Sequence, residues 1–383
     1  MEITVLILAV IAFIGWVPNT LEMIVGFLYM PLLPKVPPLP HEQCPLLSIV
    51  VPACNEAETL EPAMRSLLAL DYPRLEIIAV NDRSTDDTGK ILNRIAAGNS
   101  KLRVEHIDEL PEGWLGKNHA LQRGAGLASG EWILFTDADI VYESDALRRA
   151  MAVALEKKCD HLVALPRMML DGFWEKALVS LFSILFNFMY RPWQTTWRKS
   201  AYVGVGAFGM VRTDVYRKLE GHKVLRMEVL DDVKLGKLIK RSGHRQAVIV
   251  GSDCIRVRWL VGLNGLVKGL EKNTFAGVGY SWLAAFGSCG LVILMAVWPF
   301  AGVWIGGLLP RILCGSALLA MCLSIQVQWP TLRVSILYLL AWPLAAVLFF
   351  YIMMRSGFLA QRQGGVYWRG TLYPLDELKK NVV

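Results

Sequence analysis

Apolar residues gather at the two ends of this 383-residue chain, and charged and turn-forming residues gather in its middle. Glu22 is the only charged residue between Ile3 and Met30, and the stretch from Trp282 to Met354 is almost entirely apolar. Apolar runs of about 20 residues have the length of membrane-spanning helices. The pattern predicts five regions: a membrane anchor over residues 1–30, a linker over 31–45, a globular domain over 46–281, a transmembrane bundle over 282–354 and a basic tail over 355–383.

Within the globular region, short apolar runs alternate with segments of helical periodicity. Four runs have the length and composition of buried strands: Leu46–Pro52, Leu75–Val80, Leu102–His106 and Trp132–Thr136. We expect three helices between or beside them: one from Asn55, as its N-cap, to Leu70, one over Asp86–Ala97 capped by Ser84 or Thr85, and one around Asn118–Ala128. The alternation predicts an α/β fold with a mostly parallel central sheet, flanked by transmembrane helices.

The composition supports a membrane protein, because 54% of the residues are hydrophobic and only 19% are charged. We expect an anchor at the N-terminus and not a signal peptide, since the apolar run is long and no basic residue precedes it. The seven cysteines are scattered without a C-x-x-C pair, which argues against a disulfide framework or a zinc site. The net charge of +7 fits anionic lipid and an anionic substrate. The sequence contains no basic run with interleaved aromatic residues, which argues against nucleic-acid binding.

Two carboxylates follow the last of the four apolar runs. Alternate residues of a strand point to the same side, so Asp137 and Asp139 can face one pocket at the C-terminal end of that strand. Oxygen ligands of this kind suit Mg²⁺ or Mn²⁺, held partly by the protein and partly by substrate phosphates. The alternative is a turn in which both carboxylates are simply solvated.

Polar clusters follow three of the predicted strands. They are Asn55 and Glu56, then Asp82 to Ser84, then Asp137 to Asp139. Parallel sheets bind ligands at the carboxyl ends of their strands, so the three clusters predict one ligand site. The sequence has no G-x-G-x-x-G after its first strand and no G-x-x-x-x-G-K-[ST], which argues against a dinucleotide-dependent dehydrogenase and a P-loop ATPase.

The order of these motifs resembles that of the family 2 glycosyltransferases. The resemblance covers about Leu47 to Tyr280 and rests on five segments: Val51–Glu56, Asn81–Asp86, Gly116–Leu121, Thr136–Asp139 and Leu230–Val233. It implies a GT-A nucleotide-binding fold. The flanking apolar segments, and Gly269–Asn273 before the bundle, are similar to the membrane-bound branch that glycosylates lipids, which includes hopanoid-associated, carotenoid and ceramide glycosyltransferases.

The resemblance implies roles for individual side chains in donor binding. Asp82 would contact the uracil and ribose, Glu56 the ribose, and Lys117 the nucleotide or its diphosphate. The full set of implied donor contacts is Pro52, Glu56, Asp82, Ser84, Lys117, Asp137, Arg258 and Trp259. Asp139, assisted by Asp137, would hold the Mg²⁺ or Mn²⁺ that neutralises the departing diphosphate. A Glu56 that only stabilises the first turn of a helix and a solvated Lys117 are the alternatives.

The resemblance also implies a catalytic base. In an inverting transfer, a carboxylate takes the proton of the acceptor hydroxyl as its oxygen attacks C1 of the sugar. This role falls on Asp232, with Asp231 in support, before an expected helix over Val233–Arg241. An acidic N-cap pair is a compatible alternative. Glycines between Gly204 and Gly209 would let a bound sugar approach the backbone, or else mark a packed strand.

Processive polysaccharide synthases of the family carry Gln-x-x-Arg-Trp. Arg258 and Trp259 are present here, but Ile255 occupies the glutamine position, and the apolar bundle is small for a polymer channel. We therefore expect a membrane-bound inverting glycosyltransferase that moves one sugar from a nucleotide-sugar donor, with UDP favoured, to a membrane lipid. The alternatives are a polyprenyl-phosphate glycosyl synthase, a processive polysaccharide synthase and a non-catalytic membrane scaffold of the same fold.

The expected membrane topology rests on the apolar segments and the charge of the tail. Residues 172–195 are apolar with aromatic ends but carry charged side chains, which is typical of a helix lying in the interface. Use of a nucleotide sugar places the catalytic domain in the cytoplasm at the inner (cell) membrane. The basic tail favours the same side. We expect two full crossings in the bundle, with the short middle segment, Ile312–Gln326, re-entrant or interfacial.

Overall fold

The structure is a computed structural model, in which residues 2–259 and 261–380 are described. The chain divides into two compact units. The sheet unit consists of residues 30–169, 192–258 and 367–383, and the helical unit consists of residues 1–29, 170–191 and 259–366.

The sheet unit is built on one eight-stranded sheet with the order β3-β2-β1-β4-β7-β6-β8-β5. Strands β3, β2, β1 and β4 are parallel, and so are β6 and β8. β7 is antiparallel to both of its neighbours, and β5 is antiparallel to β8. The strands are β1 Leu47–Ala53, β2 Leu75–Asp82, β3 Leu102–Ile107, β4 Trp132–Phe135, β5 Ile140–Tyr142, β6 His161–Met168, β7 Gly209–Arg212 and β8 Gln246–Val257.

This sheet confirms the predicted α/β fold with a mostly parallel sheet. The four apolar runs of the sequence are the four parallel strands β1 to β4, and their ends agree with the prediction to within two residues. Every residue of β1 and β4 is buried, which explains why these runs are apolar almost throughout, with Ser48 as the exception, and do not alternate. The carboxyl ends of β1, β2 and β4 therefore lie at one edge of the sheet, as the polar clusters require.

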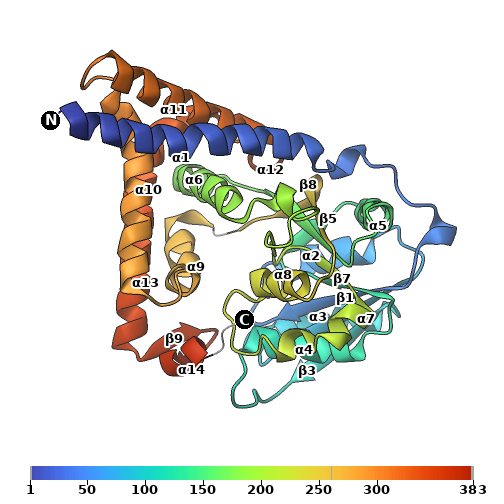
Figure 1. Ribbon diagram of the computed structural model, residues 1–383. Coiled ribbons are helices and arrows are strands. Elements are labelled where there is room, and N and C mark those ends of the chain that lie inside the picture. Colours follow the sequence, from blue (N-terminus) through green and yellow to red (C-terminus); the bar gives the residue numbers. More distant parts are fainter. Residues whose placement is uncertain (1, 260, 381–383) are drawn as a thin grey trace. The chain divides into compact units, whose positions relative to one another are not determined.

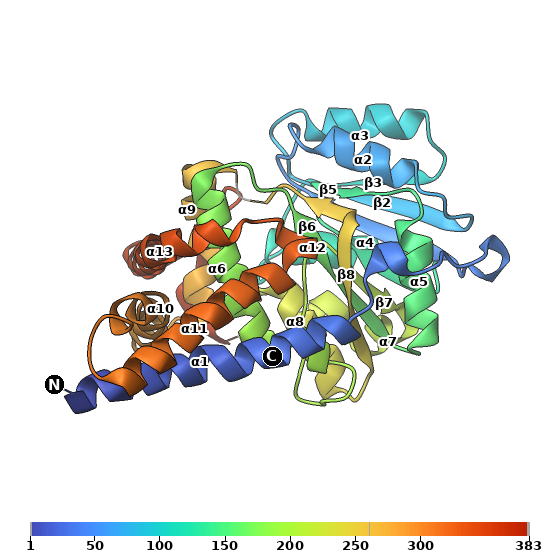
Figure 2. The ribbon, with the colours of Figure 1, turned by 90° about the horizontal axis from the view of Figure 1, so that it is seen from above.

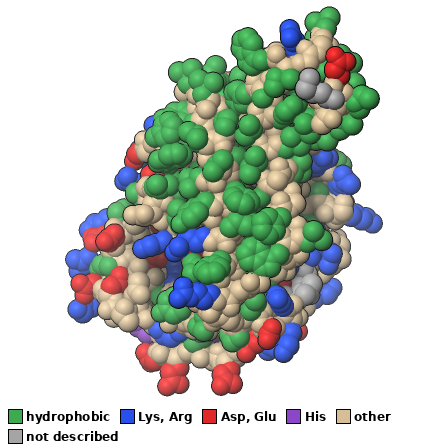
Figure 3. All heavy atoms as spheres, turned by 90° about the vertical axis from the view of Figure 1, so that its left-hand side faces the viewer, with side chains coloured by type: hydrophobic (Ala, Val, Ile, Leu, Met, Phe, Trp, Pro, Cys, Tyr) green, Lys and Arg blue, Asp and Glu red, His purple; other side chains and the backbone are tan. Residues whose placement is uncertain are grey.

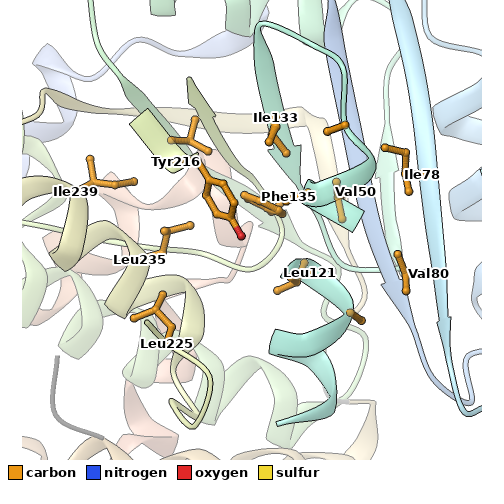
Figure 4. Packing of buried hydrophobic residues seen from close by; sticks show 14 of the residues in the cluster. Val50, Ile78, Val80, Leu121, Ile133, Phe135, Tyr216, Leu225, Leu235 and Ile239 are labelled. Carbon is orange, nitrogen blue, oxygen red and sulfur yellow. The ribbon is translucent and has the colours of Figure 1, made fainter. Parts of the chain in front are cut away.

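Helices cover the sheet on its faces. One apolar core joins strand residues such as Val50 and Ile133 to Leu121 of α4, Tyr216 of α7 and Leu235 of α8 (Figure 4). Helices α2 and α3 lie side by side elsewhere on the sheet (Figure 2). The helices of this unit are α2 Leu60–Leu68, α3 Thr88–Ala97, α4 Gly116–Leu127, α5 Ala146–Glu156, α7 Thr213–Lys218, α8 Asp231–Arg241 and α14 Leu375–Lys380.

Two predicted helix starts are wrong. Asn55 does not cap α2, which begins five residues later at Leu60; it has a positive φ of 56°, and its Oδ1 accepts from the backbone N–H of Thr85 at 2.8 Å. Neither Ser84 nor Thr85 caps α3, which begins at Thr88 after Asp87. In both places polar side chains link the loops after β1 and β2, and these links between loops replace the local caps that the sequence suggests.

Among residues 2–259 and 261–380, four helices are long and apolar enough to cross a membrane, and all four belong to the helical unit. α1 and α11 lie side by side, as do α10 and α13 (Figure 1). In Figure 2 α10 and α13 are seen end-on while α1 and α11 lie across the view, so the two pairs run in different directions. The helices are α1 Glu2–Tyr29, α6 Phe173–Tyr190, α9 Gly262–Gly277, α10 Trp282–Gly302, α11 Leu308–Val327, α12 Trp329–Leu332 and α13 Trp342–Arg362.

Aromatic and small polar contacts hold these helices together. The ring of Trp16 in α1 stacks on that of Trp342 in α13, with centroids 5.6 Å apart, and its Nε1 donates to the carbonyl of Met295 at 2.9 Å. The hydroxyls of Thr20 and Ser324 lie 2.8 Å apart. Many large apolar side chains are exposed on these helices, and Figure 3 shows apolar side chains gathered over one face.

The end of the chain forms a small hairpin of β9 Gly365–Trp368 and β10 Thr371–Pro374, followed by α14. Its residues from Tyr367 onward belong to the sheet unit. The tail therefore returns to the part of the protein that carries the polar clusters.

Candidate active site

The loop after β4 is fastened to a glycine-rich loop that precedes β7. The backbone N–H of Asp137 donates to the carbonyl of Gly206 at 3.1 Å, and the hydroxyl of Thr136 donates to the carbonyl of Ala207 at 2.9 Å. The hydroxyl of Tyr142 reaches the same carbonyl at 2.9 Å. These bonds fix where the strand-end carboxylate of Asp137 lies.

A pocket opens between this loop and the start of α8. Its charged lining is Lys117, Asp137, Asp231 and Asp232, which the sequence places in three separate motifs. Nζ of Lys117 lies 2.8 Å from Oδ1 of Asp137 and 3.7 Å from Oδ2 of Asp231. The side chain of Lys117 is only 14% exposed, so the alternative of a solvated lysine is wrong.

Lys117 is a permanent cation in this pocket. Burial lowers its pKa, but the carboxylates of Asp137, Asp231 and Asp232 more than offset that effect, so the pKa of Lys117 is raised overall. His222 also lines the pocket; burial and the charge of Lys117 lower its pKa to about 3, so it is neutral. The pocket therefore holds three carboxylates around one fixed positive charge.

Glycines let the two sides of the pocket approach each other. A Cβ on Gly204 would overlap the backbone carbonyl of Asp232, and a Cβ on Gly206 would lie 2.6 Å from Oδ2 of Asp137. Both contacts are closer than real side chains allow. The glycines are therefore required by the packing of this loop against Asp232 and Asp137, whether or not a sugar also approaches it.

Asp231 and Asp232 begin α8 but differ in their surroundings. Asp231 is buried, with Lys117 at 3.7 Å and Nε2 of His222 at 4.0 Å from its Oδ2. Asp232 is partly exposed, and its Oδ1 accepts from the backbone N–H of Val233 at 2.7 Å. Both lie in the first turn of α8, where a carboxylate is stabilised by the helix dipole. The arrangement leaves Asp232 as the more accessible carboxylate.

Asp139 and Glu56 lie in an acidic environment. Burial, followed by the charges of Asp137 and Glu56, raises the pKa of Asp139 to about 7. Burial likewise raises the pKa of Glu56, although Arg369 opposes this. Glu56 precedes α2 by four residues, so it does not stabilise the first turn of that helix.

These residues fit a divalent cation. The described residues include no group of three or more histidine, cysteine or acidic side chains arranged as a metal site. A Mg²⁺ or Mn²⁺ ion that is also bound by substrate phosphates needs only one or two carboxylates from the protein. Burial and the charges of Asp137 and Glu56 disfavour the ionised form of Asp139, and a bound cation would favour it.

A second part of the site lies at the carboxyl end of β2. Asp82 is 1% exposed, and Arg83 donates to both of its oxygens, at 2.8 and 3.1 Å. Oγ of Ser84 accepts from the backbone N–H of Asn55 at 3.1 Å, and Pro52 is buried within β1. Asp82 and Arg83 thus form a preorganised pair, whereas Ser84 and Pro52 hold the framework; contact of either with a donor remains a prediction.

The tail reaches the same edge of the sheet. Nη2 of Arg369 lies 2.6 Å from Oε1 of Glu56, and Nη1 of Arg83 donates to the hydroxyl of Thr371 at 3.3 Å. The backbone N–H of Gly116 donates to the hydroxyl of Tyr373 at 3.1 Å. The basic composition of the tail predicts only that it lies on the same side of the membrane as the catalytic domain, and nothing in the sequence pairs Arg369, Thr371 or Tyr373 with the loops they contact.

Arg258 and Trp259 are not brought into this pocket. Arg258 is exposed after β8, and neither residue is among those that line the pocket. Trp259 belongs to the helical unit, where its ring lies 5.6 Å from that of Phe182. Their contact with a donor remains a prediction.

Comparisons with known proteins support a glycosyltransferase. Residues 48–220 match the family described as Glycosyl transferase family 2. Over 344 residues the chain is 24% identical to the 4,4'-diaponeurosporenoate glycosyltransferase of Staphylococcus aureus (strain USA300), covering 86% of this chain and 89% of that protein. Its fold is similar to that of the mannosyltransferase PcManGT from Pyrobaculum calidifontis, solved with GDP-Man and Mn²⁺, with a TM-score of 0.58 and 17% identity over 94% of this chain and 99% of that one.

Proposed function

We propose that this chain, which is a family 2 glycosyltransferase, moves one sugar from a nucleotide-diphosphate donor to a membrane lipid with inversion at C1. The observation that carries the proposal is the pocket itself. Its lining includes Asp232, a partly exposed carboxylate, together with Asp137 at the carboxyl end of β4 and the fixed charge of Lys117.

The chemistry assigned to Asp232 is proton acceptance. The acceptor hydroxyl gives its proton to the carboxylate as its oxygen forms a bond to C1 of the sugar, and the bond from C1 to the diphosphate oxygen breaks. Asp231 does not compete for this role, because it is buried beside Lys117 and His222. Asp231 is a positioning residue that holds Lys117 in place.

Asp139, with Asp137, would hold Mg²⁺ or Mn²⁺. When bound, the cation would neutralise charge on the departing nucleoside diphosphate. Mn²⁺ in the structure of the mannosyltransferase of similar fold supports a divalent ion without selecting between the two.

The lipid acceptor is supported by two observations. The relative from Staphylococcus aureus is named for 4,4'-diaponeurosporenoate, and the described part of the present chain includes four helices that are apolar and long enough to cross a membrane. A UDP-linked donor follows from the resemblance of the Asn81–Asp86 motif. The GDP-Man of the structural neighbour makes GDP-sugars the second donor class to try.

The test is transfer by the purified full-length protein. It would be incubated with UDP- and GDP-sugars, a native lipid extract and Mn²⁺ or Mg²⁺, and the lipids analysed by mass spectrometry. A lipid heavier by one hexose or other sugar residue is the expected product. Nucleotide binding without any glycosylated lipid would contradict the proposal and favour a binding protein of this fold.

We further propose a multi-pass protein of the inner membrane with its catalytic part and tail in the cytoplasm. In this proposal the chain between Arg258 and Tyr367 crosses the membrane an even number of times, and the pairing of Arg369 with Glu56 supports it. Of the three described helices there that are long enough to cross, α11, with 20 residues, would be re-entrant or interfacial. The different directions of the two helix pairs support this. Alkaline phosphatase fused after Val383 should be inactive; activity there would place the tail outside.

A further inference from the structure

The hairpin at the end of the chain lies on the edge where the proposed function places the donor. We propose that this tail is part of the donor site, with Arg369 donating to a phosphate oxygen of the bound nucleotide sugar. This inference rests on the proposed function and extends it to residues 257 to 313 positions away in the sequence from the residues they touch.

Three contacts fasten the tail to that edge, one for each loop that the donor would touch. Arg369 pairs with Glu56 after β1, Thr371 accepts from Arg83 after β2, and Tyr373 accepts from Gly116 at the start of α4. Tyr373 is buried, so its hydroxyl is held in place. The position of the tail after the last helix does not by itself explain why it contacts all three loops.

One nitrogen of the Arg369 guanidinium donates to no acceptor in the described part of the chain. Its Nη2 is bound to Glu56, but its Nη1 is buried and has no hydrogen-bond partner among residues 2–259 and 261–380. A buried charged N–H without an acceptor is unfavourable, and a phosphate oxygen would satisfy it. The guanidinium carbon of Arg369 lies 5.6 Å from the centroid of the Trp368 ring, and this contact limits the rotation of the guanidinium.

Charge explains why a cation from the tail belongs here. The motifs after the strands supply carboxylates, and a diphosphate would be repelled by Glu56 alone. Arg369 neutralises Glu56 and presents a second N–H from the planar guanidinium, a geometry suited to phosphate. The alternative is a tail that covers the edge and excludes the donor, and the two arrangements give opposite results when the contact is removed.

The experiment compares full-length variants for binding of UDP and of GDP in the presence of Mn²⁺, by calorimetry, and for the donor KM. Arg369→Ala should weaken nucleotide binding and raise KM by about 10-fold or more, with kcat changed far less, because a charge-assisted hydrogen bond is lost. Arg369→Lys keeps the charge without the planar fork and should lie between. Lys379→Ala, which removes an exposed charge of the same tail, should stay within about twofold.

Unchanged or tighter binding in Arg369→Ala would overturn the inference, and tighter binding would identify an inhibitory cover. If the wild type neither binds nucleotide nor transfers sugar, the proposed function fails instead, so the two failures are distinct. Trypsin provides a second measurement that needs no variant. Bound nucleotide should slow cleavage after Arg369 but not after Lys379, and equal rates at Arg369 with and without nucleotide would contradict the inference.

Discussion

The pocket around Lys117 and the edge of the sheet that the C-terminal tail contacts differ in how their charges are balanced. In the pocket, Asp137, Asp231 and Asp232 surround a single cation, Lys117. At the edge, Asp82 is paired with Arg83, and Glu56 with Arg369. Where carboxylates outnumber cationic side chains, a bound metal cation and proton acceptance are favoured. Where each carboxylate is paired with an arginine, the recognition of a ligand by hydrogen bonds is favoured.

This difference separates chemistry from binding. Changes in the pocket should lower kcat, and changes at the edge should raise the donor KM, since they remove interactions made at different stages of the reaction. The comparison fails if both kinds of change affect both constants equally.

The largest loss of sugar transfer is expected when the cation site is removed. Asp139→Ala should reduce transfer by about 10³-fold or more, because the charge of the leaving diphosphate would no longer be compensated. EDTA should have the same effect on the wild type, with activity restored by Mn²⁺ or Mg²⁺, while neither ion restores the variant. Glu109→Ala, at an exposed loop acid, is the control. Activity of Asp139→Ala under full chelation would remove the cation from the mechanism.

A smaller loss is expected from the base. Asp232→Asn should lower kcat by about 10²-fold or more with donor binding nearly unchanged, since the amide fills the same space but cannot take the proton. Kinetics with saturating donor would measure this. A polyprenyl-phosphate acceptor needs little base help, so an Asp232→Asn variant with normal kcat would indicate that alternative. Equal loss of donor affinity and turnover would make Asp232 a positioning residue.

The pH dependence follows from Asp139. Its pKa of about 7 lies above the ordinary 3.8, so the folded protein holds this proton more tightly than the unfolded chain does. Without a cation, the free energy of unfolding should fall as pH rises from about 4 to about 7 and then level off. Cation affinity should fall about tenfold per pH unit below 7, because the proton competes with the metal. Asp139→Asn should lose both dependences; if it keeps them, another group titrates.

The sequence allowed prediction of the parts of the site that are local. Asp137 follows the apolar strand β4 and Asp82 ends β2, and the parallel order of those strands brings them to one edge. The pairing of Lys117 with Asp137 and Asp231 could not be predicted from the sequence, because it depends on how α4 and α8 pack on the sheet. Arg369 lies 313 residues from Glu56, and no periodicity or spacing connects them.

The smallest effect tests the packing that separates the pocket from its surroundings. Gly204→Ala would drive a methyl group into the carbonyl of Asp232, so it should destabilise the protein by about 1–3 kcal/mol and displace the base. Gly126→Ala is the matched control. Gly126 is exposed within α4 and a Cβ there meets nothing within 4 Å, so the change should stabilise the protein by about 0.5–1 kcal/mol. Thermal unfolding and kcat of both variants decide the matter: if Gly204→Ala matches Gly126→Ala in both, the loop does not press against Asp232, and the position of the base has to be set by α8 alone.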